Sequence, residues 1–228
     1  MNKKILQQLA IMFQASPQLM RDNDLLSKAV NGTFGVEIQP EFVNIVALSE
    51  QIDHAVLEKY FSTVWQPQTK KYKYSGLSII DEVNALHPLS VLDLGCGYNE
   101  FKGKINNLIG IDPYNTKADV KSAILDYASA EPFDVLICLG SINFGSVDKI
   151  YNELEHAVKL TKKDGLLYFR ANPGTQHTAL EATWIEFFGW TSEFIINSAD
   201  KLGCSILELR QEMGERGSRY YFVFKKDK

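Results

Sequence analysis

Hydrophobic positions in the first part of the chain recur at steps of three and four residues, which is the spacing of one face of a helix. Four stretches show this spacing: 2–14, 18–30, a stretch that begins near Pro40 and stops at Trp65, and 76–86. Turn-forming pairs such as Ser16-Pro17 and Asn31-Gly32 separate them. The pattern predicts a helical N-terminal region over residues 1–88.

After Pro88 the pattern changes to short apolar runs between polar segments, which is typical of strands. Seven strands are predicted: 91–94, 108–111, a weak one at 119–125, 134–139, 166–170, 205–210 and 219–224. Helices are predicted at 147–162, 178–188 and 192–202. Alternating strands and helices imply an α/β fold. We expect a doubly wound, mostly parallel seven-stranded sheet that ends in a C-terminal antiparallel hairpin, within a domain of residues 89–228.

The strongest chemical signal is a glycine-containing loop directly after the first strand, DLGCG at 93–97. Glycines at a strand's carboxyl end let the backbone turn sharply and approach a ligand closely. In a doubly wound sheet this position is the crevice where nucleotide-like ligands bind. The next strand ends in GID at 110–112, and its carboxylate can accept hydrogen bonds from ribose hydroxyls.

The residues around the loop indicate which ribose-containing ligand fits. Glu100 stands where the dinucleotide fingerprint has its third glycine, so a negative charge would meet a pyrophosphate. No Walker loop follows the strand either. With Asp93 and Asp112 nearby, the pocket suits a cationic ligand without phosphate, and S-adenosylmethionine (SAM) is such a ligand. A nicotinamide-dependent reductase is the alternative that Glu100 opposes.

Three ordered motifs, VLDLGCG at 91–97, GID at 110–112 and DVLICLG at 134–140, resemble those of class I SAM-dependent methyltransferases. The resemblance extends from Leu89 to Lys226. It implies that SAM is the cofactor and that the chain transfers a methyl group. The cofactor-binding residues that it implies are Asp93, Gly95, Cys96 and Gly97 at the methionine part, Asp112 and Pro113 at the ribose, Asp126 near the adenine amino group, and Leu139 and Gly140 beside the sulfonium.

Some of these residues also have structural readings. Asp112 could cap a turn before Pro113, Asp126 could cap a helix, and Cys96 could be a packing residue. The loop departs from the family because Asn99 stands at the usual third glycine and only about ten residues lead to the second strand. The first crossover helix is therefore expected to be very short or missing. A SAM-binding module without transferase activity is the resulting alternative.

The acceptor side is expected at the carboxyl ends of the fourth and fifth strands. The resemblance implies that Ser141 and Asn143 face the acceptor. Arg170 and Asn172 begin a polar segment after the fifth strand and are predicted to bind the substrate. His177 in the same segment is the candidate general base, although a lone loop histidine is more often solvated. The helical region 1–88 is expected to act as a lid.

The acceptor itself is only partly restricted. The [DN]-P-P-[YF] motif of amino-group methylation is missing, no Pro-Cys follows the fourth strand, and no metal-ligand cluster is visible, so no metal is expected. A net charge of −4 argues against a surface built mainly for nucleic acid. Lys70-Lys71-Tyr72-Lys73-Tyr74 could hold a phosphate or stack a base, but a solvated turn is the favoured interpretation. A small-molecule acceptor is favoured, with a group on RNA or protein as the alternative.

Cellular location follows from cysteine usage and hydrophobicity. The three cysteines are far apart and form no disulfide framework. The first residues lack the apolar core of a signal peptide, and no apolar run is long enough to span a bilayer. We expect a cytoplasmic protein without membrane contact; its oligomeric state is not encoded in any recognisable pattern.

Overall fold

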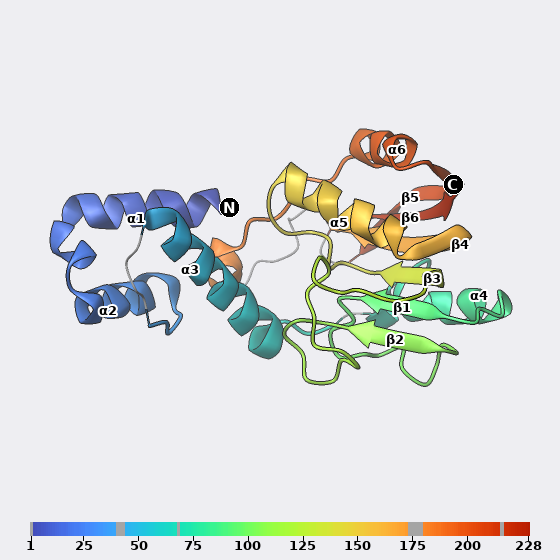
Figure 1. Cartoon of the computed structure of the whole chain (residues 1–228), viewed down its shortest axis with the longest axis horizontal. Coiled ribbons are helices and arrows are strands. Elements are labelled where there is room, and N and C mark those ends of the chain that lie inside the picture. Colours follow the sequence, from blue (N-terminus) through green and yellow to red (C-terminus); the bar gives the residue numbers. More distant parts are fainter. Residues whose placement is uncertain (1, 40–43, 68, 173–179, 215–216) are drawn as a thin grey trace. The chain divides into compact units, whose positions relative to one another are not determined.

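The computed structural model describes the whole chain apart from residues 1, 40–43, 68, 173–179 and 215–216 (Figure 1). The chain forms two compact units, which are treated separately below. The helical unit comprises Met1–Trp65 and His177–Glu186. The sheet unit comprises Gln66–Gln176 and Phe187–Lys228. Residues 66–88 therefore fold with the sheet, and the division lies earlier than the boundary near Pro88 that the pattern change suggested.

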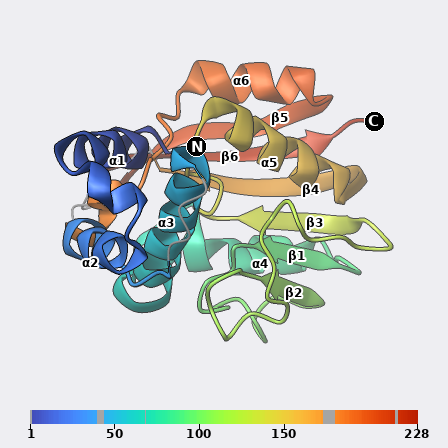
Figure 2. The ribbon, with the colours of Figure 1, turned by 60° about the vertical axis from the view of Figure 1, so that its left-hand side comes forward.

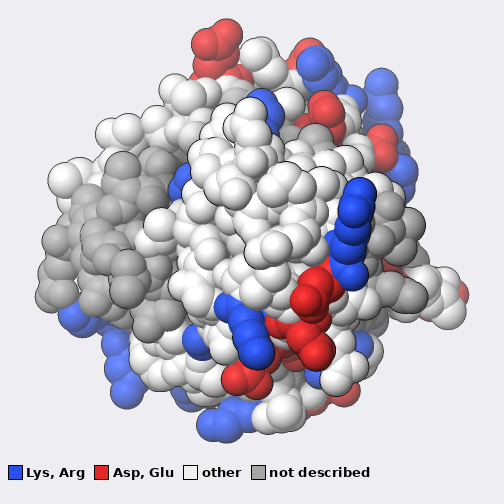
Figure 3. Space-filling view, turned by 90° about the vertical axis from the view of Figure 1, so that its left-hand side faces the viewer, with Lys and Arg blue, Asp and Glu red and all other residues white. Residues whose placement is uncertain are grey.

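The helical unit contains the helices expected near the start of the chain. Its elements are α1 (Lys3–Ala15), the 3-10 helix η1 (Pro17–Met20), α2 (Asn23–Phe34), α3 (Ile45–Lys59), the π-helical turn η2 (Tyr60–Val64) and the 3-10 helix η5 (Leu180–Trp184). Each of α1, α2 and α3 begins with an Asn or Asp whose side chain accepts backbone N–H bonds of the first turn. The face that carries α1 and α2 shows mostly uncharged side chains (Figure 3).

Asn2 joins three segments of the helical unit. Its side-chain oxygen caps α1, and its Nδ2 donates to Asp53 of α3 at 2.8 Å and to the Trp184 carbonyl at 2.6 Å. The Trp184 ring also packs edge-on against Phe34, with the centroids 4.8 Å apart. Residues 180–186 thus belong to this unit by specific contacts. In the described part of the predicted 178–188 helix, residues 180–188, the helical segment is the short 3-10 helix η5.

The sheet unit contains a mixed sheet in the order β2-β1-β3-β4-β6-β5 (Figure 1). The strands are β1 (Val91–Leu94), β2 (Leu108–Ile111), β3 (Phe133–Cys138), β4 (Thr161–Ala171), β5 (Cys204–Gly214) and β6 (Gly217–Lys226). β6 runs antiparallel to both of its neighbours, and the pairs among β2, β1, β3 and β4 are parallel. The predicted α/β fold with a closing hairpin is confirmed.

The weak strand predicted at 119–125, which would have given the sheet seven strands, is wrong. Within this stretch only Val120 pairs with the sheet, through an isolated bridge to Ile111. The carboxylate of Asp119 accepts the N–H of Gly110 at 2.8 Å. The side chain of Asp119 therefore occupies a backbone donor at the edge of β2. Fewer backbone groups of β2 remain to form hydrogen bonds with another strand.

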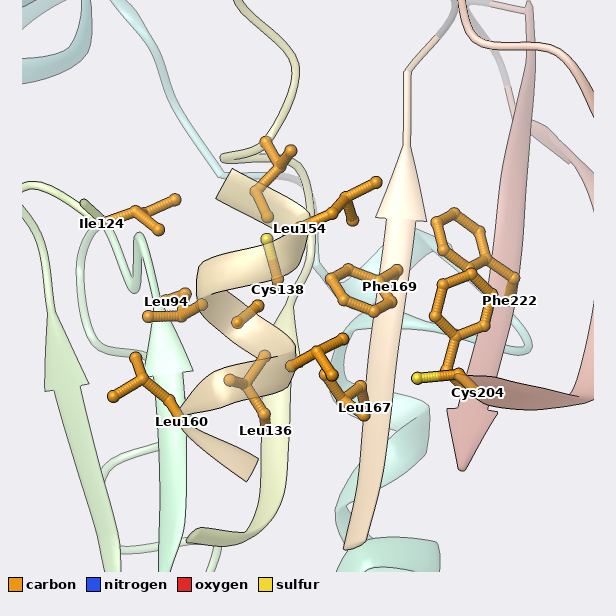
Figure 4. Packing of buried hydrophobic residues seen from close by; sticks show 14 of the residues in the cluster. Leu94, Ile124, Leu136, Cys138, Leu154, Leu160, Leu167, Phe169, Cys204 and Phe222 are labelled. Atoms are coloured by element: carbon orange, nitrogen blue, oxygen red, sulfur yellow. The ribbon is translucent and has the colours of Figure 1, made fainter. Parts of the chain in front are cut away.

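Two apolar layers cover the sheet. α5 (Val147–Lys159) and α6 (Ser192–Lys201) lie on one face, whereas η4 (Gly76–Ile79) and α4 (Ile80–Ala85) lie on the other (Figure 2). η3 (Thr69–Lys71) precedes them. On the α5 face Phe169 stacks on Phe222 at a centroid distance of 5.0 Å (Figure 4). No helix in the described part of the chain is long and apolar enough to cross a membrane.

Truncating Phe169 tests this core. The side chain is 2% exposed and also contacts Phe224 edge-on at 5.5 Å. We expect Phe169→Ala to lower the free energy of unfolding by about 3–5 kcal/mol, because it removes apolar burial and leaves a cavity. Urea unfolding measures the effect, and Ile196→Ala at a half-exposed position of α6 is the control, with a change below about 0.5 kcal/mol. Equal losses in both variants would contradict the packing described here.

Candidate functional site

The loops after β1 and β3 touch at the carboxyl edge of the sheet. Gly95 has a φ of 67°, and a Cβ at this position would lie 2.1 Å from the Cβ of Ser141. The Ser141 hydroxyl donates to the Leu94 carbonyl at 2.5 Å and lies 3.0 Å from the Cys138 sulfur. Only glycine permits this approach, so the first glycine of the predicted loop is required by geometry.

Asp112 holds the second glycine of the loop. One of its carboxylate oxygens accepts the Gly97 N–H at 3.0 Å, and the other accepts the N–H groups of Tyr114 and Asn115, each at 2.8 Å. A carboxylate offers roughly four acceptor positions. Three are already used, so Asp112 caps the turn as its structural reading suggested and retains about one position for a ligand hydroxyl. Binding of ribose by Asp112 stays a prediction.

Asp93 is the second carboxylate at this edge and differs sharply from Asp112. It is 3% exposed, and no described residue donates a hydrogen bond to its side chain. Burial, together with the nearby charge of Asp112, raises the pKa of Asp93 to about 8. A buried carboxylate without donors is costly when ionised, and a cationic group placed beside it would relieve that cost.

The first crossover contains no helix, as predicted: residues 95–107 consist mostly of turns, with an isolated bridge between Lys102 and Ile105. Asn99, with a φ of 55°, replaces the third glycine, and its Nδ2 donates to the Lys117 carbonyl at 3.0 Å. Phe101 and Ile105 are buried and pack with Ile79 of η4. Because no helix N-terminus follows β1, the positive helix end that a pyrophosphate requires is absent at this point.

The other residues predicted to bind the cofactor differ in how exposed they are. Pro113, Leu139 and Gly140 are partly buried, and Asp126 is exposed in a turn that begins at Ala123. Cys96 lies against Gly110, and burial beside Asp93 raises the pKa of its thiol, so it packs rather than reacts. The cofactor roles of these residues stay predictions.

On the acceptor side, Asn143 joins two loops. It is 1% exposed, its Oδ1 accepts the Asn172 N–H at 3.0 Å, and its Nδ2 donates to the Gly140 carbonyl at 3.2 Å. The amide therefore positions the strand ends, and its contact with an acceptor, like those of Ser141 and Asn172, stays a prediction. His177 lies outside the described residues.

Residues 66–72, at the start of the sheet unit, contact the loop after β1 and the end of β4. Gln66 donates to the Tyr98 hydroxyl at 3.3 Å, and Thr69 donates to the Glu100 carboxylate. Tyr72 is 6% exposed, and the guanidinium of Arg170 stands over its ring at 4.5 Å. The interpretation of this stretch as a solvated turn is therefore wrong for Tyr72. The alternation of lysine and tyrosine in 70–74 was the signal in the sequence that this stretch could have a role. It could not show that Tyr72 is buried, because its partner Arg170 lies about a hundred residues further along the chain.

Comparison with known proteins adds evidence for the fold. No protein-family model and no curated protein matches this sequence. Among solved structures, the Burkholderia thailandensis 1,6-didemethyltoxoflavin-N1-methyltransferase has a TM-score of 0.60 at 11% identity, covering 85% of this chain and 95% of its own. N-methyltransferase NodS from Bradyrhizobium japonicum WM9, solved with S-adenosylhomocysteine (SAH), has a TM-score of 0.56 at 14% identity, over 77% and 98%.

A third similar structure is a SAM-dependent methyltransferase from Thermotoga maritima, described as a possible histamine N-methyltransferase. Its TM-score is 0.53 at 17% identity, and the match covers 75% of this chain and 99% of its own. These similarities and the strand order show that the chain has the class I SAM-dependent methyltransferase fold. The fold implied by the sequence motifs is confirmed.

The raised pKa of Asp93 predicts an unusual dependence of stability on pH. Between the ordinary carboxyl pKa and about 8, the folded protein binds a proton that the unfolded chain releases, so stability falls as pH rises. Asp93→Asn removes this penalty. Its stability relative to wild type should increase between pH 5 and 8, by at most about 1.4 kcal/mol per pH unit. Urea unfolding at several pH values measures this, with exposed Asp200→Asn as the control. If the stability difference between Asp93→Asn and wild type were the same at every pH, the raised pKa of Asp93 would be refuted.

Proposed function

We propose that this chain is a SAM-dependent methyltransferase that acts on a small-molecule acceptor. The observation that carries the proposal is the buried carboxylate of Asp93 beside the loop of Gly95 and Gly97, to which no described residue donates a hydrogen bond. A cation is the partner that this carboxylate lacks, and SAM carries an ammonium group and a sulfonium. The class I fold and the neighbours solved with SAH support the same cofactor.

The residues at the edge of the sheet fit SAM in chemistry. Asp93 would hold the ammonium group, and the loop through Gly95 and Gly97 would let the backbone approach the methionine part. Asp112 would accept a ribose hydroxyl, and Asp126 would lie near the adenine amino group. Leu139 and Gly140 would flank the sulfonium. When bound, SAM supplies an electrophilic methyl group.

The protein's contribution to such a transfer is positioning and exclusion of water. Ser141 and Asn143 fix the loop after β3 against β1 and against the end of β4. An uncharged amine acceptor has its own lone pair, so it needs a base only if its proton must leave early. This is consistent with the absence of paired carboxylates for acid–base work in the motifs. His177 stays the candidate base.

Nitrogen acceptors are the first class to test. The Burkholderia protein is named as an N1-methyltransferase with 1,6-didemethyltoxoflavin bound, and NodS is named as an N-methyltransferase. The acidic net charge of −4 also favours a small molecule over RNA.

A SAM-binding module without transferase activity is the second candidate. The observation that favours it is the occupied carboxylate of Asp112, which is committed to Gly97, Tyr114 and Asn115 and can anchor the ribose with only one position. Methyl transfer to any nitrogen compound would exclude this candidate, whereas SAH binding without turnover over a broad set of amines would favour it.

Calorimetric titration with SAH and with NADH tests the cofactor directly. We expect micromolar SAH binding and no NADH binding by wild type. Asp93→Asn should weaken SAH binding at least about tenfold, because the ammonium group loses an ionic partner. Asp200→Asn, on the exposed surface of α6, should bind like wild type. Tight NADH binding without SAH binding would replace the proposal with a reductase.

The same titration should depend on pH. Asp93 is protonated below about pH 8 in the free protein and must release its proton when a cation binds. SAH affinity is therefore expected to rise from pH 6 to pH 8, by up to about tenfold per pH unit, and then to level off. Asp93→Asn should show no such rise. A pH-independent wild-type affinity would place the cofactor's ammonium group elsewhere.

A further inference from the structure

The segment 184–190, with the sequence WIEFFGW, places its four aromatic side chains in different surroundings. Trp184 packs in the helical unit. Phe188 and Trp190 belong to the apolar layer on the α5 face of the sheet, where their rings meet edge-on with the centroids 5.4 Å apart. Phe187 stands between these two groups and remains partly exposed. Its position therefore needs a separate explanation.

Backbone pairing holds Phe187 against the loop after β3. Phe187 forms an isolated antiparallel bridge with Phe144 of that loop, and the Phe188 N–H donates to the Asn143 carbonyl at 2.8 Å. Residues directly opposite each other in an antiparallel pair point their side chains to the same side, whereas the next residue along points to the other side. Phe144 and Phe187 therefore share one side of the bridge, and Phe188 points away from them into the core.

The rings of Phe144 and Phe187 form a pair that keeps contact with solvent. Their centroids lie 5.4 Å apart, and the ring planes cross at 64°. Such an edge-to-face contact uses the edge of one ring and one face of the other. Both side chains are partly exposed. Apolar ring surface thus faces outward at a place where the backbone is held by hydrogen bonds on both sides.

The ring pair lies beside the position proposed for methyl transfer. Phe144 directly follows Asn143, whose Nδ2 donates to the carbonyl of Gly140 at 3.2 Å. Gly140 is one of the residues expected to flank the sulfonium. The Oδ1 of the same amide accepts the Asn172 N–H after β4 at 3.0 Å. An acceptor that rests on the two rings would therefore adjoin the methyl group that it receives.

We propose that Phe144 and Phe187 form a stacking platform for the methyl acceptor, which would make the acceptor a planar heteroaromatic compound with a nucleophilic ring nitrogen. This inference rests on the proposed methyltransferase function. Stacking on a fixed aromatic side chain defines the plane of the acceptor ring, and the lone pair of a pyridine-type or imidazole-type nitrogen lies in that plane. Defining the plane therefore aligns the lone pair for an in-line displacement. The missing [DN]-P-P-[YF] motif of amino-group methylation also favours a ring nitrogen over an amino group attached to the ring.

The transfer is balanced without a further reactant. The lone pair of the ring nitrogen forms the new N–C bond while the S–C bond of SAM breaks, and the electron pair of that bond stays on the sulfur of SAH. The positive charge of the sulfonium passes to the acceptor ring. An imidazole-type ring then releases its N–H proton to water, whereas a pyridine-type ring keeps the charge. Neither case requires a base before the transfer.

NMR titration of the protein without cofactor tests the platform directly. The probes are benzimidazole, quinoline and benzamide, with cyclohexanecarboxamide as the saturated match of benzamide. We expect saturable binding of the aromatic probes, and binding of cyclohexanecarboxamide at least about threefold weaker than that of benzamide, because the saturated ring cannot stack. Equal binding of this matched pair, or no binding of any aromatic probe, would overturn the platform.

Replacement of each ring by leucine keeps an apolar side chain and removes the stacking surface. Phe144→Leu and Phe187→Leu should each weaken benzimidazole binding at least about threefold, whereas Phe187→Tyr, which keeps the ring, should bind like wild type. The control is Phe194→Leu, at a partly buried phenylalanine of α6, and it should leave the affinity unchanged. Wild-type affinity in both platform variants would contradict the proposal.

Calorimetry with SAH separates the platform from the proposed function, because the adenine of the cofactor is another planar ring. Phe187→Leu should bind SAH like wild type if the platform serves the acceptor. A loss of SAH affinity as large as the loss for benzimidazole would assign the rings to the cofactor and overturn the acceptor role. Failure of wild type to bind SAH would instead refute the methyltransferase function, while the benzimidazole titration would still decide the platform.

Turnover assays with SAM complete the test. Heteroaromatic compounds with a ring nitrogen should be methylated at least about tenfold more efficiently than aliphatic amines, and Phe187→Leu should reduce this preference through KM. Equal efficiency for the two classes of acceptor would contradict the inference.

Discussion

The contact between Gly95 and Ser141 determines the geometry of the whole carboxyl edge. β1 and β3 are adjacent and parallel, so the loops that leave them compete for the same space, and the missing Cβ resolves the conflict. The Ser141 hydroxyl then bonds to Leu94, while Asn143 ties the same loop to the end of β4. The ends of β1, β3 and β4 are thereby joined by hydrogen bonds at the edge where Asp93 lies.

Charge is distributed unevenly along this edge. The ends of β1 and β2 carry the carboxyl groups of Asp93 and Asp112, and the first of these receives no hydrogen bond from any residue that the structure describes. The ends of β4 and β6 carry two guanidinium groups around Tyr72. Leu139 at the end of β3 lies between them and bonds to one of the arginines. The sheet order β2-β1-β3-β4-β6 therefore places the carboxyl groups and the guanidinium groups on opposite sides of the end of β3.

Local patterns predicted the elements that depend on local physics. The apolar runs of β1, β2 and β3 agree with the predicted strands to within a residue, and the short spacing after Gly97 correctly indicated a missing crossover helix. Properties that depend on distant partners could not be predicted. Asp119 occupies an edge donor that a further strand would use, Tyr72 is buried by arginines from β4 and β6, and Trp184 packs with Phe34. The glycine loop was recognisable from the sequence. The three backbone N–H groups that bind the Asp112 carboxylate were not.

The discontinuous helical unit has a consequence for biosynthesis. Its first segment ends at Trp65, but Asn2 and Phe34 find their partner Trp184 only after more than a hundred further residues have been made. At ordinary translation rates that interval is on the order of ten seconds. During this time helices α1 to α3 lack their contacts with Trp184 on the ribosome-bound chain. The packing of the helical unit is completed only when the segment around Trp184 has been made.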